Sequence, residues 1–261
     1  MRAFDSKKET YLKLLLYGLP GSLKTRTSAT AAWDERSSPS LMLEAGGNPI
    51  SLSDYEKRPD IIHMETLEDF NLPYNWLAAG QNPDDPFCKK FGLQPPYKSL
   101  IIDSITETQR MSFNTVTGST NVGPGSFSQR VQRQHFGQVL SQMINLAKLF
   151  YALPMHVILT SLEKANKDEI TGSITYAPLL WGQSDTEVGG YAYAVGRMCH
   201  RAALPAKTIK IVEDASEGEI TAVALFKPSG KYVAKDQYGK FGDYMVDPSI
   251  PKMLDLIYGG S

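Results

Sequence analysis

The sequence predicts an α/β domain whose mainly parallel β-sheet is flanked by helices. Short apolar runs alternate with helical patterns along the first 160 residues, and such alternation is typical of parallel strands joined by right-handed crossovers. A glycine-rich turn follows the first run, and no 20–50-residue repeat is visible. The buried strands predicted from these runs cover residues 12–17, 40–43, 61–64, 100–102 and 155–160.

The second half of the chain adds a long helix and a different C-terminal texture. Phe136, Val139, Leu140 and Met143 recur at spacings of three and four, which predicts a helix over 129–150 with one core face. Further on, 208–212 and 220–226 are separated by a polar turn and predict a β-hairpin that closes one edge of the sheet. A short helix is expected over 249–257, and the Pro-rich segment 82–97 is expected to be a surface loop.

Composition narrows the class of protein. The chain has 261 residues with 27 Lys and Arg against 28 Asp and Glu, so a nucleic-acid surface has to be a local patch. Two cysteines exclude a disulfide framework, and no apolar run reaches the roughly 18 residues of a membrane span. With no signal-like start and no linker, we expect one domain over 1–261, without a membrane, in the cytoplasm.

The clearest motif is the segment GLPGSLKT, which follows the first predicted strand and precedes a helix-compatible segment. It fits the phosphate-binding P-loop, in which backbone N–H groups cradle phosphates, a lysine neutralises them and a hydroxyl ligates Mg²⁺. The expected nucleotide contacts are Gly18, Leu19, Pro20, Gly21, Ser22, Leu23, Lys24, Thr25 and Arg26. Leu23 stands where the motif has its second glycine, and its Cβ costs about 1 kcal/mol if φ is positive there.

A second motif supports ATP and Mg²⁺ as ligands. The apolar run 100–102 ends in Asp103, the pattern of a Walker B strand whose carboxylate holds Mg²⁺ through water. Ligands of such sheets bind at the carboxyl ends of the strands, where Thr25 and Asp103 are both expected. The alternative for Asp103 alone is an ordinary acid at a strand end.

Two further strand ends offer catalytic groups. Glu44 follows the strand over 40–43 and is a candidate general base for the attacking water, the alternative being a solvated acid. Thr160 and Ser161 end another strand and are candidates for sensing the γ-phosphate, or else simple strand termini.

With these motifs in order, the chain resembles the RecA-like P-loop ATPases of bacteriophages, which are AAA-family proteins of the single-strand annealing and recombinase type. The resemblance rests on 17–25, 100–106 and 156–160, with weaker similarity at 232–236 and 247–249. It implies a bacterial host cytoplasm, ATP hydrolysis with the glutamate at Glu44, and partners among phage or host replication and recombination proteins.

The predicted partner is single-stranded DNA. No Asp or Glu occurs between Thr108 and Leu162, whereas Arg130 and Arg133 stand beside a Gly/Ser/Thr/Asn-rich loop that contains Phe127. Cations on phosphates and an aromatic ring on a base suit an unpaired strand. The alternative is a surface loop that merely lacks acids.

The resemblance also implies a homo-oligomer, either a ring or a filament, with ATP at subunit interfaces. Lys235 is then the first candidate, and Lys227 the second, for a cation inserted into the neighbour's site. A competing function is a nucleotide-dependent switch or scaffold that regulates a replication partner, as a helicase loader does, with little hydrolysis. The two functions differ in their expected rate of ATP hydrolysis, and Leu23 in place of the second P-loop glycine speaks against fast hydrolysis.

Overall fold

A computed structural model describes residues 10–47, 49–118, 132–200 and 222–259. The strands are β1 (Lys13–Gly18), β2 (Ser40–Glu44), β3 (Asp60–His63), β4 (Ser99–Asp103), β5 (His156–Lys167), β6 (Ile174–Pro178), β7 (Ala194–His200), β8 (Ala222–Leu225), β9 (Lys235–Asp236) and β10 (Tyr244–Val246). The α-helices are α1 (Lys24–Ala29), α2 (Asn71–Ala78), α3 (Pro86–Phe91), α4 (Ile105–Thr117), α5 (Arg133–Tyr151), α6 (Ser184–Tyr191) and α8 (Ile250–Tyr258). Short 3₁₀ turns are η1 (Thr30–Trp33), η2 (Ile50–Leu52) and η3 (Glu68–Phe70).

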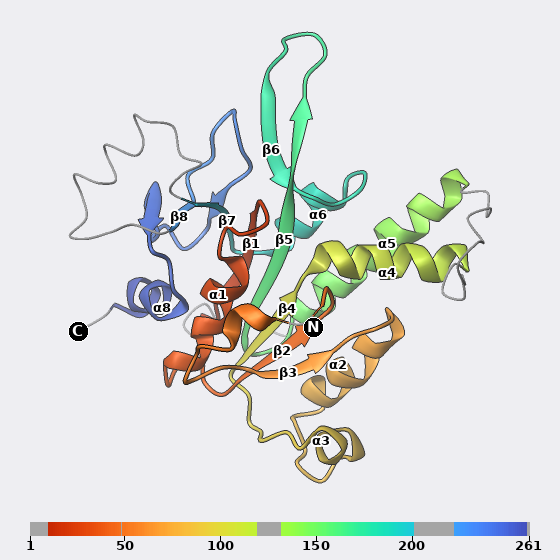
Figure 1. The fold of residues 1–261 in the computed structure, drawn as a ribbon, viewed down its shortest axis with the longest axis vertical. Helices are drawn as coiled ribbons and strands as arrows, with labels where there is room; N and C mark the ends of the chain where they lie inside the picture. The colour runs from red at the N-terminus through yellow and green to blue at the C-terminus, as the bar shows by residue number, and fades with distance from the viewer. Residues whose placement is uncertain (1–9, 48, 119–131, 201–221, 260–261) are drawn as a thin grey trace, which may run out of the picture.

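The central sheet confirms the predicted fold class. Its strand order is β10-β8-β7-β1-β5-β4-β2-β3, and the pairs from β7 to β3 are parallel. All five predicted strands exist within a residue or two, except that β5 runs well past its expected end. β5 lies between the phosphate-loop strand β1 and the Asp103 strand β4, so the carboxyl ends of β1 and β4 flank the middle of β5, which continues beyond this edge of the sheet (Figure 1).

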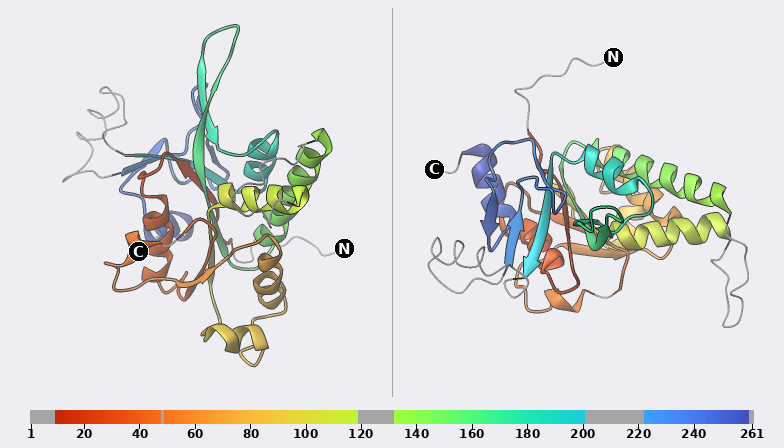
Figure 2. Two further views of the ribbon diagram at one scale, coloured as in Figure 1. Left: turned by 45° about the vertical axis from the view of Figure 1, so that its right-hand side comes forward. Right: turned by 90° about the horizontal axis from the view of Figure 1, so that it is seen from above.

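Helices cover both faces of the sheet (Figure 2) and bury two apolar clusters. On one face α2 and α5 pack with Trp76 and Met143 against alternate strand residues such as Leu15. On the other face α1 and α8 pack with Ala29 and Met253. Strand residues alternate between the two clusters, as a sheet buried on both faces requires.

The C-terminal prediction is partly wrong. β8 forms within the predicted 220–226 strand, but both of its sides are occupied, by β7 and by β10, in antiparallel pairing. The predicted partner 208–212 lies outside the described residues. The sheet edge is β10 instead. The helix expected over 249–257 is confirmed as α8, with the Ser249 hydroxyl accepting from the Lys252 N–H.

Two predicted loops contain regular structure. The segment 82–97 includes α3, which the Asp85 side chain caps at its N-terminus by accepting from Phe87 N–H at 2.8 Å. The segment after Thr160 continues as a β-hairpin, in which β5 and β6 pair antiparallel from Glu163 with Pro178 to Lys167 with Ile174. This β5–β6 arm projects beyond the sheet (Figure 1).

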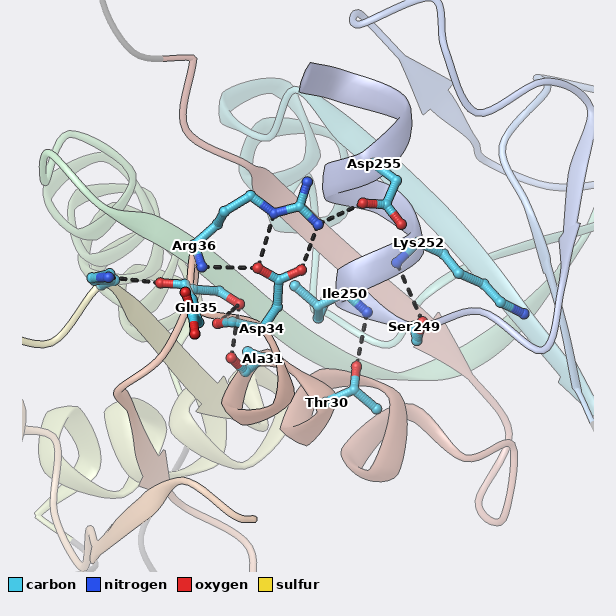
Figure 3. A network of polar contacts seen from close by, with 11 residues as sticks. Thr30, Ala31, Asp34, Glu35, Arg36, Ser249, Ile250, Lys252 and Asp255 are labelled. Carbon is cyan, nitrogen blue, oxygen red and sulfur yellow. Dashed lines mark hydrogen bonds and ion pairs between the residues drawn. The ribbon is translucent and has the colours of Figure 1, made fainter. Parts of the chain in front are cut away.

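A polar network closes the opposite edge, where the strands begin (Figure 3). Arg36 pairs with Asp34 beside η1 and with Asp255 of α8 at 2.6 Å. The Ile250 N–H donates to the Thr30 hydroxyl at 2.8 Å, which fastens the start of α8 to the same segment. Among the described residues no helix combines the length and the apolar character that crossing a membrane requires.

Candidate nucleotide site

The loop between β1 and α1 has the geometry that a phosphate cradle requires. A Cβ on Gly18 would lie 2.3 Å from the Met198 carbonyl oxygen, so only glycine fits beside β7. Gly21 has φ +77°, a conformation that glycine adopts without steric cost. The loop therefore turns sharply enough to aim the N-terminus of α1 at the edge of the sheet.

Leu23 occupies the left-handed region, with φ +64° and ψ 19°, immediately before α1. The condition for a strain cost at this position, a positive φ, is thus met, and the strain costs on the order of 1–2 kcal/mol. The side chain is half-buried against the cluster below α1, so packing offsets part of that cost.

Lys24 is buried within the loop. Its Nζ donates to the carbonyl oxygens of Gly18 and Leu19, both at 2.9 Å, and to the Ser22 hydroxyl at 3.2 Å. Burial lowers the pKa of Lys24 to about 8, while the negative charges of Asp103 and Glu163 oppose that shift. A polyanion arriving at this ammonium would raise its pKa again and favour the charged form.

The centre of the site is a cluster of oxygen atoms at the end of β4 and beside the middle of β5. The Thr25 hydroxyl donates to Asp103 Oδ2 at 2.6 Å, and the Thr160 hydroxyl donates to Asp103 Oδ1. The structure thus brings together the P-loop hydroxyl, the Walker B carboxylate and one of the two sensor candidates. The other candidate, Ser161, lies on the opposite face and contacts the Thr106 hydroxyl at 3.0 Å.

Glu44 lies directly beside this cluster. It is paired in register with Asp103 across β2 and β4, which places the two residues one strand spacing apart, about 4.8 Å. Its carboxylate is almost fully buried, with Oε1 accepting from Gly46 N–H at 2.7 Å and Oε2 at 2.6 Å from His63 Nδ1. The strand-end position predicted the place of Glu44, but no spacing signal indicated His63.

A partly buried ion pair lies on the other side of the loop and was not predicted from the sequence. Arg197 of β7 donates to both oxygens of Glu163, at 2.7 and 3.1 Å, and its guanidinium lies 3.9 Å from the centre of the Tyr176 ring. With Leu19, Pro20 and Ser22 this pair lines a pocket of about 280 Å³. Glu163 and Arg197 are 34 positions apart and lie on β5 and β7, the two strands that flank β1, so the sequence offers no pattern that would reveal the pair.

Three cations that were candidates for the site have partners elsewhere in the chain. Arg26 pairs with Asp54 at 3.0 Å and stacks on Tyr55, away from the loop. The Lys235 ammonium donates to the carbonyl oxygens of Gly190 and Ala192, at 2.9 and 2.7 Å, at the end of α6. Lys227, the second candidate, pairs with Asp243.

The predicted DNA contacts are only partly visible. Phe127 and Arg130 lie outside the described residues, and Arg133 is exposed at the first turn of α5. The expected helix over 129–150 begins at Arg133, so a shared helical face with Arg130 stays a prediction.

Three aromatic rings gather beside Arg133. Phe113 of α4 lies 5.7 Å from Phe136 of α5 and 4.9 Å from Trp181, between ring centroids, and Phe136 is 48% exposed. We call Phe113, Phe136 and Trp181 the aromatic cluster. Phe136 was assigned to the core face from its spacing, and this assignment is wrong because α5 extends beyond the sheet here.

The donor set fits Mg²⁺. A threonine hydroxyl and a carboxylate 2.6 Å apart are oxygen ligands of the kind this hard cation takes, with phosphate oxygens and water completing its shell. Within the described ranges no group of three or more His, Cys, Asp or Glu could hold a metal. A site of one hydroxyl, one carboxylate and substrate phosphates needs no such group.

Comparison with known families agrees with this geometry. The family model described as an AAA domain (AAA_24) matches residues 10–238, which include every element of the candidate site. The chain belongs to this AAA domain family. A search of curated proteins found no match.

Membership in the AAA domain family indicates a nucleotide-binding ATPase of the P-loop class, for which Mg²⁺ is the usual companion of the nucleotide. The mainly parallel sheet flanked by helices is consistent with such a core. The phage origin and the recombinase type expected from the sequence go further than this match.

Proposed function

We propose that this chain is a Mg²⁺-dependent ATPase that acts on single-stranded DNA as a homo-oligomer, in annealing or recombination. The observation that carries the ATPase is the meeting of Thr25, Asp103 and Thr160, with Glu44 one strand away. The DNA and oligomer steps rest on separate features, which have separate tests.

The residues divide the work of hydrolysis by position. Lys24 would neutralise the β- and γ-phosphate oxygens, and Thr25 and Asp103 would hold Mg²⁺, which would supply charge stabilisation to the phosphates. Glu44 accepts a proton from water, whose oxygen bonds to the γ-phosphorus as the bond to the β,γ-bridging oxygen breaks. The products are ADP and inorganic phosphate.

The decisive experiment compares binding with turnover. Glu44→Gln keeps the shape of the side chain but removes the base, so we expect ATP affinity within about 2-fold of wild type and turnover reduced about 100-fold or more. Asp34→Asn, a carboxylate change at the opposite edge, is the control and keeps both. Normal turnover in Glu44→Gln would reject Glu44 as the base.

The aromatic cluster supports single-stranded DNA as the partner. On each of α4 and α5 an arginine precedes the aromatic residue by one turn: Arg110 before Phe113, and Arg133 before Phe136. Residues three apart share a helix face, so cations for phosphates flank rings that can stack on bases.

α4 connects the aromatic cluster to the phosphate site. The Thr106 hydroxyl contacts the hydroxyl of Ser161, the neighbour of Thr160. Gln109 Oε1 accepts from the backbone N–H of Trp181 at 2.8 Å. Arg110 is paired with Glu107 and is therefore less available than Arg133. A DNA strand bound to the aromatic cluster would thus contact α4, the helix that follows Asp103.

DNA binding is tested by titrating labelled single strands at several salt concentrations with ATP present. Loss of a ring, in Phe136→Ala or Phe127→Ala, should weaken binding by about 1–3 kcal/mol with little change in salt dependence. Loss of a cation, in Arg133→Ala or Arg130→Ala, should reduce the magnitude of the slope of log K against log salt by about 0.7. Lys252→Ala on α8 is the control. Wild-type DNA affinity and wild-type salt dependence in all four variants would reject this surface as the DNA-binding site.

Oligomerisation through a cation donated in trans is tested by mixing subunits. In this role Lys235 has to leave the carbonyl oxygens at the end of α6, where burial lowers its pKa. Mixed Lys235→Ala and Glu44→Gln subunits should regain part of the activity that each lacks alone. No recovery at any ratio, with both variants assembled, would count against a shared site.

The second candidate function is a nucleotide-dependent switch with little hydrolysis. The left-handed Leu23 favours it, because its side chain replaces a glycine beside the phosphates. Tight ATP binding with turnover that single-stranded DNA does not raise would favour this function over the first.

A further inference from the structure

We propose that His63 is the positioning residue for Glu44: its ring Nδ1 fixes the carboxylate so that one face of the base is presented to the phosphate site. The inference rests on the proposed hydrolysis and adds a residue that takes part in it. Its basis is the 2.6 Å contact between His63 Nδ1 and Glu44 Oε2.

Strand register makes this contact specific. Glu44 pairs with Asp103 on one side and with His63 on the other, so the three residues form a row across β4, β2 and β3. Residues directly opposite in a sheet point to the same face. Thr25 at the start of α1 contacts Asp103, so the row faces α1 and the phosphate loop.

Both oxygens of Glu44 have a partner, and the two partners differ in kind. Gly46 holds Oε1 through its backbone N–H, which belongs to the same strand end as Glu44 itself. His63 holds Oε2 from the neighbouring strand and is therefore the side chain that sets the rotation of the carboxylate. Each carboxylate oxygen keeps a second lone pair, so Glu44 can still accept from water.

The environment of the two side chains suits a positioning role. The Glu44 side chain is 7% exposed, whereas the His63 side chain is 57% exposed on the edge strand β3. Without His63, the Gly46 N–H alone would hold the carboxylate, through one oxygen. The ring lies beyond Glu44, on the side away from Asp103, so it acts on the reaction through Glu44.

The test separates binding from catalysis with three variants. His63→Ala removes the partner, His63→Asn returns an amide donor close to the Nδ1 position, and Ile61→Ala changes the same face of β3 two residues away. We expect kcat to fall about 10-fold in His63→Ala, with KM and ATP affinity within 2-fold of wild type. His63→Asn should recover most of kcat, and Ile61→Ala should match wild type throughout.

Ring ¹⁵N resonances of His63 give a readout that does not depend on activity. In the nucleotide-free protein they should change in Glu44→Gln and stay unchanged in Ile61→Ala. Unchanged resonances in Glu44→Gln, or wild-type kcat in His63→Ala, would overturn the role of His63. ATP binding without turnover in the wild type would instead overturn the hydrolytic function itself, and the role of His63 with it.

Discussion

The two edges of the sheet use polar residues in opposite ways. At the carboxyl edge Asp103, Glu44 and Lys24 converge around one place, and the backbone is strained at Leu23. At the amino edge the polar groups bind one another and connect distant segments, as Arg36 does between Asp34 and Asp255 (Figure 3). The first arrangement is built to meet a ligand, the second to close the fold.

The buried ionisable groups of the amino edge are likewise hydrogen-bonded within the fold. At the amino edge Leu12 N–H donates to His156 Nδ1 at 3.0 Å, which fixes the neutral ring with its proton on Nε2. Lys13 donates to the carbonyl oxygens of Leu153 and Met155, both at 2.6 Å, and burial lowers its pKa to about 7. Variants at the two edges should therefore separate ligand binding from stability.

The largest effect is expected for Lys24→Ala. The variant loses the ammonium that would meet the phosphates, and hydrogen bonds to charged groups contribute about 1.5–3 kcal/mol each, so ATP affinity should fall about 100-fold. Calorimetric titration measures the affinity, and thermal unfolding should show a much smaller change. Unchanged affinity would remove the phosphate loop from the site.

The next effect is the acid sensitivity of His156. Burial lowers the pKa of His156 to about 4, against 6.5 in the unfolded chain. The unfolded state therefore binds more protons below pH 6.5, and stability falls as the pH drops toward 4, by about 3 kcal/mol in total from this residue. Urea unfolding at pH 7 and pH 4.5 measures the loss, which His156→Phe should largely abolish; an equal loss in the variant would assign it to other groups.

A smaller effect is expected for Arg36→Ala. The guanidinium and Asp255 are partly exposed, so the two ion pairs are screened, and we expect a loss of about 1–2 kcal/mol in the free energy of unfolding. ATP affinity should stay at the wild-type value. A variant that keeps its stability but loses nucleotide binding would show that the two edges are not independent.

The smallest effect is expected for Leu23→Gly. Glycine removes the left-handed strain of about 1–2 kcal/mol but also loses the half-buried side chain and stiffens the unfolded chain less, so stability should change by less than about 1 kcal/mol. ATP affinity or turnover should change several-fold, because the loop geometry changes beside the phosphates. Leu23→Ala, which keeps the strain, is the control.

Local patterns explain why most of the carboxyl edge could be predicted. The P-loop, the strand ending in Asp103 and the position of Glu44 all follow from short motifs, because parallel strands bring their carboxyl ends together. His63 and the Glu163–Arg197 pair could not be predicted, since the first depends on β3 being the neighbour of β2 and the second on β1 lying between β5 and β7.

Two errors in the predicted elements have definite causes. β5 was expected to end at Thr160 because its apolar run stops there, yet its polar continuation pairs with β6 outside the sheet, where no buried face is required. α3 was missed within a Pro-rich segment, although Asp85 before Pro86 and Gly92 at the end are regular start and stop signals of a helix. In both cases the expected apolar pattern was absent, but hydrogen bonding was satisfied locally.

β5 is also one continuous strand that reaches three parts of the molecule. It starts at His156 on the amino edge, places Thr160 against Asp103 in the middle, and ends in the projecting β5–β6 arm. The first part of β5 is hydrogen-bonded to β1 on one side and to β4 on the other, so a shift of β5 along its axis would break both sets of hydrogen bonds. The β5–β6 arm and the Thr160 hydroxyl are therefore parts of one strand, which joins a projecting surface to the carboxylate that would hold the metal.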